Sequence, residues 1–396
     1  MLGDEELAAI EEVLRAEVPL SQGIFRERFE AAFSQHIGIR HAVSVTSGTV
    51  ALELAIQLLD LRPGDEVIAT PQTYQATIQP LLDLDVRVRF ADIGPDCPNL
   101  GVEQVGKLIT ERTKAVLLVH YGGLPVDMDP IMALAEEHGL TVVEDAAHAL
   151  GSWYRTRRPG AIGHIGCFSF HSSKNITTLG EGGMVTVARD DWAERLRHLR
   201  GNKADMLLVD RAQVFGLSAS PPPRALYPGN AYTHDCVAVR GHGTNATMSE
   251  PAAAVGLVQL GRLPDFVARR QAIAARLSET LAGIGGVRVP MEPLGAVNAY
   301  HLFTFFVDAV KFDRDELIRC LDAEGVETYL RYFPLHLLPE WRARGHGMGE
   351  CPAAERLWFS EHVNLPCFPS MTDSQVDHLT KALLVALAKS ARQTRN

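Results

Sequence analysis

One lysine of the chain, Lys174, lies among small and polar residues in the stretch 168–175 (FSFHSSKN), and a glycine-rich run at 180–183 follows it. Upstream, Asp145 stands in the sequence EDAAH. A lysine in such a setting can form a Schiff base with an aldehyde, and a nearby carboxylate can hold the ring nitrogen that makes pyridoxal phosphate an electron sink. Most lysines are solvated surface cations, so the elements around Lys174 have to support this chemistry.

The first two thirds of the chain alternates strand-like and helix-like segments. The clearest unit consists of the apolar run 115–119, a helix-like segment over 129–139 that Asp129 can cap, and the apolar run 140–144. This pattern predicts parallel strands joined by a right-handed crossover, in a mostly parallel sheet with helices on both faces. Ligands bind at the carboxyl ends of such strands, and Asp145 directly follows the second run.

Residues 42–49 (AVSVTSGT) lead into a segment, 50–59, that has apolar residues at helical spacing. A strand, a Ser/Gly/Thr turn and a helix start can bind an anion such as phosphate, because unpaired N–H groups and the positive end of the helix dipole point at it. A plain helix cap is the alternative. Tyr74 follows the strand-like run 66–70, where it can stack on a pyridine ring or belong to the core.

Composition narrows the class of protein. The 396 residues are 46% hydrophobic and 22% charged, which is typical of a globular protein of two or three domains. The net charge of -10, without a long basic run, argues against nucleic acid or an anionic membrane as partner. No signal peptide or membrane-spanning run is visible, so we expect a cytoplasmic protein. Cysteine and histidine spacings predict no metal site.

Two domains are predicted. Residues 1–262 form the large domain, and from 263 the pattern changes to a smaller α+β domain over 263–396. The segment 201–243 contains three consecutive prolines at 221–223, which cannot occupy a helix interior. We therefore interpret 201–243 as a long loop or arm, which either shapes a substrate mouth or is a solvated connection.

Taken together, these residues resemble the DegT/StrS-type sugar aminotransferases, which are fold-type I pyridoxal phosphate enzymes. The resemblance covers nearly the whole chain, and its motifs occur in the family's order: 47–49 (SGT), 64–68 (GDEVI), 73–74 (TY), 144–148 (EDAAH), 168–174 (FSFHSSK), 180–183 (GEGG), 244–250 (TNATMSE), 332–336 (YFPLH), 351–355 (CPAAE) and 364–366 (NLP). It implies an α/β fold, with a mostly parallel seven-stranded-type sheet between helices and a smaller α+β C-terminal domain.

The resemblance implies a role for each residue around the cofactor ring of pyridoxal 5'-phosphate. Lys174 would hold the cofactor as the Schiff-base lysine and move the proton during transfer. Asp145 would pair with the pyridinium nitrogen. His148 would lie near the ring hydroxyl, and Tyr74 would stack on the ring.

A second group of residues would bind the cofactor's phosphate. By resemblance these are Gly48, Thr49 and Ser169, together with Asn245 of a neighbouring subunit, which implies a homodimer with shared active sites. Many relatives follow this asparagine with Tyr-Arg, whereas this chain continues with Ala246-Thr247. That departure removes a cation and an aromatic ring from beside the cofactor.

Two residues are candidates for substrate contact. Arg331 can clamp the α-carboxylate of an amino donor, because a planar guanidinium matches a carboxylate bidentately; the alternative is an arginine extending from a sheet edge into solvent. His336 lies in a Pro-Leu-His segment that approaches the site in relatives.

The predicted function is amino transfer by a ping-pong mechanism. Glutamate or glutamine would donate the nitrogen, and the acceptor would be a keto sugar, with or without a nucleotide, or a keto cyclitol. Relatives with histidine in place of the lysine run dehydrations, which Lys174 argues against. Two alternatives stay open: a pyridoxal phosphate lyase or aromatising enzyme acting on an amino-shikimate-like intermediate, and a non-catalytic regulator that binds the cofactor.

Overall fold

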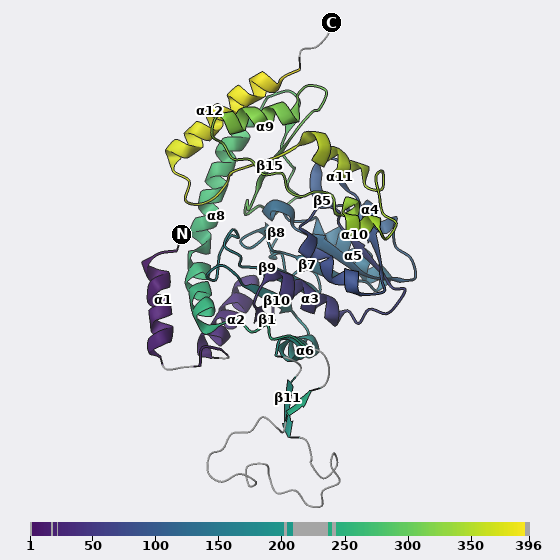
Figure 1. Ribbon diagram of the computed structural model, residues 1–396, viewed down its shortest axis with the longest axis vertical. Helices are drawn as coiled ribbons and strands as arrows, with labels where there is room; N and C mark the ends of the chain where they lie inside the picture. Colours follow the sequence, from purple (N-terminus) through teal and green to yellow (C-terminus); the bar gives the residue numbers. More distant parts are fainter. Residues whose placement is uncertain are drawn as a thin grey trace, which may run out of the picture.

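The computed structural model describes residues 2–16, 19–21, 23–201, 204–208, 237–239 and 243–392. Its centre is a seven-stranded sheet in the order β1-β10-β9-β7-β6-β2-β3 (Figure 1). The strands are β1 (His41–Val45), β2 (Glu66–Ala69), β3 (Arg87–Phe90), β6 (Thr113–Val119), β7 (Thr141–Asp145), β9 (Ile165–Ser169) and β10 (Gly183–Val187). Only β10 runs antiparallel to its neighbours, so the predicted mostly parallel sheet is confirmed.

Apolar residues on successive strand positions bury both faces of this sheet. Val67 and Ala69 of β2 pack into a cluster that includes helices α3 (Gly48–Leu58) and α6 (Asp190–Arg200), whereas Ile68 packs on the opposite face with α5 (Met128–His138). A third cluster, on the side of β9 and β10, holds α2 (Ile24–Ile37) and the first half of α8 (Glu250–Leu281). Helix α1 (Asp4–Arg15) packs on α8. The result is a helix–sheet–helix sandwich (Figure 1).

The helix predicted over 129–139 starts slightly earlier than expected. Asp127, not Asp129, occupies the N-cap position of α5, and Gly139 ends the helix in the left-handed conformation at φ 64°. Asp129 lies inside the first turn, where its carboxylate pairs with Arg155 and Arg157 at 2.6 and 2.5 Å. The capping role predicted for Asp129 is therefore wrong. The helix begins one residue before Asp129, so this carboxylate binds the two arginines instead of the first N–H groups of the helix.

A smaller unit follows α8. Its elements are a three-stranded sheet of β13 (Val287–Arg288), β15 (Phe303–Val307) and β16 (His362–Leu365), covered by α9 (Arg314–Ala323) and α12 (Asp373–Ser390), with its own hydrophobic cluster. This arrangement agrees with the expected smaller α+β unit. The predicted boundary at residue 262, however, falls inside α8, which continues through Pro264 and links the two units without a loop (Figure 1).

Short elements connect these units. They are β4 (Ile93–Gly94), β5 (Cys97–Leu100), β8 (Trp153–Tyr154), β14 (Ala296–Val297), α4 (Val102–Gly106), α10 (Pro339–Arg342), α11 (Pro352–Arg356), the 3-10 helices η1 (Gln75–Thr77), η2 (Gln79–Asp83), η3 (Tyr121–Gly123) and η5 (Leu335–Leu337), and the π-helix η6 (Leu357–Glu361). Within the predicted arm 201–243, strands β11 (Ala204–Leu208) and β12 (Val237–Val239) pair antiparallel, and most of the remainder lies outside the described residues.

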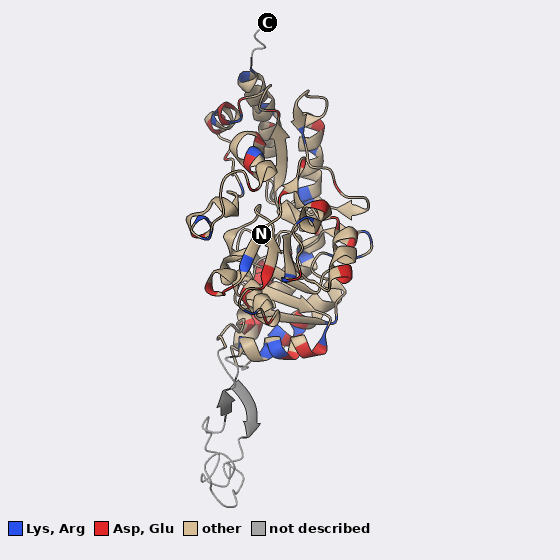
Figure 2. Ribbon diagram, turned by 90° about the vertical axis from the view of Figure 1, so that its right-hand side faces the viewer, with Lys and Arg blue, Asp and Glu red and all other residues tan. Residues whose placement is uncertain are grey.

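Basic and acidic residues are interspersed along the ribbon in the view of Figure 2. None of the helices in the described part of the chain has the length and apolarity needed to cross a membrane.

Candidate active site

A cavity of about 520 Å³ opens at the carboxyl ends of the central strands. The last residues of β6, β7 and β9, which are Val119, Asp145 and Ser169, all line it. This is where a mostly parallel sheet is expected to bind a ligand. The structure brings together eight of the predicted residues around this cavity: Gly48, Thr49, Tyr74, Asp145, His148, Ser169, Lys174 and Arg331.

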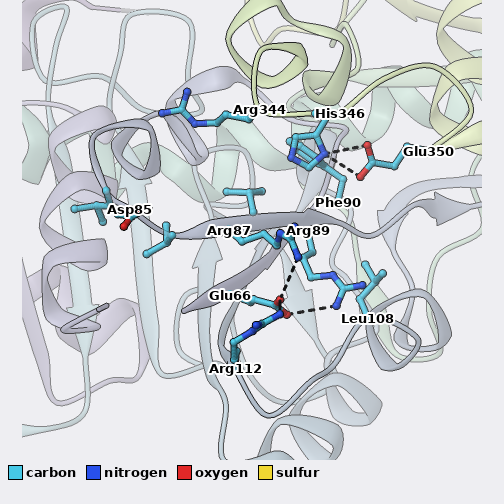
Figure 3. Close-up of a pocket in the computed structure, with 14 residues that line it drawn as sticks. Glu66, Asp85, Arg87, Arg89, Phe90, Leu108, Arg112, Arg344, His346 and Glu350 are labelled. Atoms are coloured by element: carbon cyan, nitrogen blue, oxygen red, sulfur yellow. Dashed lines mark hydrogen bonds and ion pairs between the residues drawn. The ribbon is translucent and has the colours of Figure 1, made fainter. Parts of the chain in front are cut away.

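A second hollow of about 660 Å³ lies along the edge strand β3 (Figure 3). Within it, Arg89 and Arg112 contact the buried carboxylate of Glu66, and His346 contacts Glu350. Because none of the predicted site residues lines this hollow, the cavity beside Asp145 is the candidate active site.

Lys174 lies in a loop that is fixed on both sides of it. Its backbone N–H donates to the His171 carbonyl at 2.8 Å, and the Asn175 side chain donates to the Leu150 carbonyl at 2.9 Å. Burial, together with the nearby positive charge of Arg331 and against the effect of Asp145, lowers the pKa of Lys174 to about 8. The fraction of neutral, nucleophilic amine at neutral pH is therefore about a tenth, far more than for a solvated lysine.

Asp145 is held by two hydrogen bonds although it is only 5% exposed. The Thr77 hydroxyl donates to Oδ2 at 2.7 Å, and the Ala147 N–H donates to Oδ1 at 3.0 Å. Since a carboxylate can only accept, the Thr77 proton is used there, and Thr73 must donate to the Thr77 oxygen at 2.7 Å. These hydrogen bonds fix the orientation of the Asp145 carboxylate on the cavity wall, where it can pair with a cationic ring nitrogen.

The start of α3 has the geometry that can bind an anion. The Ser47 hydroxyl caps this helix by accepting from the Val50 N–H at 3.2 Å, while the first N–H groups of the helix, at Gly48 and Thr49, have no acceptor within it. A Cβ on Gly48 would lie 2.7 Å from the Cβ of Ser169, so glycine is needed for the helix to approach β9 this closely. An anion site, a lysine and a carboxylate in one cavity fit pyridoxal phosphate.

His148 uses both ring nitrogens within the protein. A backbone N–H can only donate, so the Gly122 N–H at 3.3 Å makes Nδ1 an acceptor and leaves the proton on Nε2, which contacts the Tyr332 hydroxyl at 3.1 Å. Burial lowers the pKa of His148 well below its usual value, so the ring stays neutral. The imidazole lies nearly parallel to the rings of His301 and Tyr332, whose centroids are 4.3 and 5.9 Å away.

Arg331 lines the cavity with its guanidinium 5.1 Å from the Tyr329 ring. Within the described part of the chain, no carboxylate lies within ion-pair distance of it. His336 does not line the cavity: it is buried and contacts Glu355 at 2.9 Å. Asn245 is exposed and bridges to Gly201, so it also lies outside the cavity of its own chain.

Two contributors were missed by the sequence analysis. Thr77 contacts Asp145, and Tyr332 contacts His148, yet the sequence analysis assigned no role to Thr77 or Tyr332. The spacing of Thr73 and Thr77, one helical turn apart, was the available signal for the first. Tyr332 directly follows Arg331, which was the signal for the second. Among the described residues, no three His, Cys, Asp or Glu side chains are grouped as a metal site requires.

Comparison with known proteins places this geometry in a family. Residues 1–384 match the DegT/DnrJ/EryC1/StrS aminotransferase family. The spore coat polysaccharide biosynthesis protein SpsC of Bacillus subtilis is 35% identical, over 97% of this chain and 94% of that protein.

Two solved structures share the whole fold. DesV of S. venezuelae superposes with a TM-score of 0.83 at 35% identity, over 96% of this chain and 94% of that one. The aminotransferase TlmJ of Streptoalloteichus hindustanus superposes with a TM-score of 0.85 at 32% identity, over 98% and 97%. The chain therefore belongs to the DegT/DnrJ/EryC1/StrS aminotransferase family, and it is an aminotransferase that uses pyridoxal 5'-phosphate.

Proposed function

We propose that the protein moves an amino group from glutamate or glutamine to the carbonyl of a keto sugar or keto cyclitol, in two half-reactions. The observation that carries this proposal is the convergence of Lys174, Asp145 and the start of α3 on one cavity. A sugar acceptor is supported by SpsC, which is named as a polysaccharide biosynthesis protein. In this proposal the protein works in the synthesis of an amino sugar or aminocyclitol.

Bound pyridoxal phosphate supplies an electron sink for the negative charge that develops at the donor's α-carbon. Asp145 keeps the ring nitrogen positively charged, and its hydrogen bonds from Thr77 and Ala147 hold it in place. The N–H groups at the start of α3 and the Ser169 hydroxyl bind the phosphate. Lys174, with its pKa near 8, takes the proton from the donor's α-carbon and returns it in the opposite half-reaction.

The half-reaction can be tested without knowing the acceptor. The purified protein with its cofactor should lose its absorbance band near the visible edge when glutamate or glutamine is added, and 2-oxo acid should form in an amount equal to the active sites. Formation of more 2-oxo acid than there are active sites should require a ketone acceptor. If the visible band persists with every amino acid tested, or if a ketone must be present before any oxo acid forms, the two-step scheme is wrong.

Arg331 provides a second prediction. Its guanidinium faces the cavity without a carboxylate partner among the described residues, so we propose that it binds the donor's α-carboxylate. Arg331→Gln should raise the KM for the donor about tenfold to a hundredfold and change kcat much less, because one charge-assisted pair is worth about 1.5–3 kcal/mol. Steady-state kinetics with varied donor measures this.

A matched control separates this role from a general loss of charge. Arg319 is a surface arginine that pairs with Glu316 far from the cavity, and Arg319→Gln should leave the donor's KM unchanged. A fall in kcat with an unaltered KM in Arg331→Gln would instead place Arg331 at the reacting carbon or at the acceptor.

We also propose that the active form is a homodimer. Asn245 is exposed and lies outside its own cavity, so its amide can serve a phosphate site only in a second subunit. Light scattering of the purified protein should give twice the mass of the chain. A monomer with full activity would contradict the proposal.

A further inference from the structure

The hydroxyl of Tyr332 has a proton that the described part of the protein does not use. It accepts from His148 Nε2 at 3.1 Å, since the Gly122 N–H fixes the imidazole tautomer. Because His148 Nε2 carries its proton toward this oxygen, the hydroxyl must direct its own proton elsewhere.

That proton faces the cavity. Tyr332 lines the cavity wall next to Tyr74, and among the described residues no acceptor for its hydroxyl is found. Burial raises the pKa of Tyr332 to about 12, so the hydroxyl keeps its proton at any working pH. Tyr332 is half-buried on the cavity wall, so a ligand that fills the cavity displaces the water that would otherwise accept from this hydroxyl, which points to an acceptor atom on the ligand at this place.

The chemistry of the cofactor identifies the acceptor, if the cofactor's other polar groups bind as proposed above. Asp145 takes the ring nitrogen, Lys174 takes the aldehyde carbon, and the start of α3 takes the phosphate. The ring hydroxyl oxygen is then the one polar group without a protein partner. His148 was expected beside it, but both nitrogens of His148 are already engaged by Gly122 and Tyr332.

We propose that Tyr332 donates a hydrogen bond to the ring oxygen of pyridoxal phosphate, and that His148 is the positioning residue that aims the Tyr332 hydroxyl. His148 is well suited to hold that direction. Its neutral ring lies beside the rings of His301 and Tyr332 at interplanar angles of 21° and 12°, and the Gly122 N–H bonds to its Nδ1.

The hydrogen bond has a consequence that can be measured in the spectrum. A donor on the ring oxygen stabilises negative charge there, so a proton shared between this oxygen and the lysine nitrogen is held less tightly. The pH midpoint of the visible absorbance band is therefore lower with Tyr332 than without it. Removing the hydroxyl should raise the midpoint by about one unit, the size expected for one hydrogen bond to a charged group.

The experiment compares Tyr332→Phe with Tyr329→Phe in the full chain loaded with pyridoxal phosphate. Tyr329 is on the same segment and contacts Glu327 outside the cavity, and phenylalanine keeps its ring under Arg331. We expect the midpoint to rise by about one unit in Tyr332→Phe and by less than about 0.2 unit in Tyr329→Phe. An unchanged midpoint in Tyr332→Phe would overturn the proposal.

A second variant covers the case in which Tyr332→Phe does not fold. His148→Leu removes the group that aims the hydroxyl, so it should shift the midpoint in the same direction by a smaller amount. A midpoint that falls, or stays, in His148→Leu contradicts the positioning role. The titration needs no amino donor, so it is separate from the proposed function: loss of the visible band with glutamate tests amino transfer, and the midpoint tests Tyr332.

Discussion

Lys174→Ala is expected to abolish amino transfer, with a loss of about a thousandfold or more, because no other described lysine lines the cavity to attach the cofactor or to move the proton. The variant should still take up pyridoxal phosphate weakly through Asp145 and α3. Its spectrum should not respond to glutamate or glutamine. Spectra before and after donor addition, with oxo-acid assays, measure both effects.

Lys114→Ala is the matched control for this variant. Lys114 is an exposed lysine on β6, so its replacement should leave the spectrum and the rate as they are. An active Lys174→Ala enzyme would remove the lysine from the mechanism.

The pH dependence of cofactor loading gives an independent check on Lys174. The neutral amine is the form that attacks the aldehyde, and burial lowers its pKa to about 8. The rate of loading onto the cofactor-free protein should therefore rise with pH through about 8 and then level off. A rate that keeps rising to pH 10 would indicate an ordinary solvated lysine.

The second large effect is expected at Asp145, which in the proposed mechanism pairs with the nitrogen of the cofactor's pyridine ring. Asp145→Asn should lower kcat by about a hundredfold to a thousandfold, because a neutral amide no longer keeps the ring nitrogen positively charged. The amide is close in shape, so the free energy of unfolding should change much less than activity. Half-reaction rates with donor, together with thermal unfolding of the cofactor-free protein, separate the two.

Thr77 offers a graded version of the same experiment. Thr77→Val keeps the shape of the side chain but removes the hydrogen bond to Asp145 Oδ2, so we expect about a tenfold loss of rate. Thr77→Ser retains the hydroxyl and should restore most of it. Equal losses in the serine and valine variants would show that packing, rather than the hydrogen bond, is what matters.

The central sheet could be predicted because its strands are short apolar runs buried on both faces, as in β6 and β7. Asp145 could be predicted because it lies at the carboxyl end of a strand, where such sheets bind ligands. Gly48 could be predicted because it lies in a Ser/Gly/Thr turn between a strand and a helix. Thr77 and Tyr332 could not be predicted with equal ease. Their contacts join segments 68 and 184 residues apart, which no local pattern encodes.

His336 is the opposite case: its motif predicted a contact with substrate, whereas the residue lies outside the cavity. The segment 332–336 does reach the cavity, but through Tyr332 at its start. By His336 the chain has turned into η5, and the imidazole packs against Phe90 and pairs with Glu355.

Helix α8 has a consequence for how the molecule denatures. Its first half, including Leu263 and Val267, belongs to the cluster beside β9 and β10, and its second half, including Ile273 and Leu277, belongs to the cluster of the smaller unit. If either cluster unfolds, its half of α8 loses its packing, and this destabilises the other half of the same helix. The described units should therefore lose their structure in a single cooperative transition rather than one after the other.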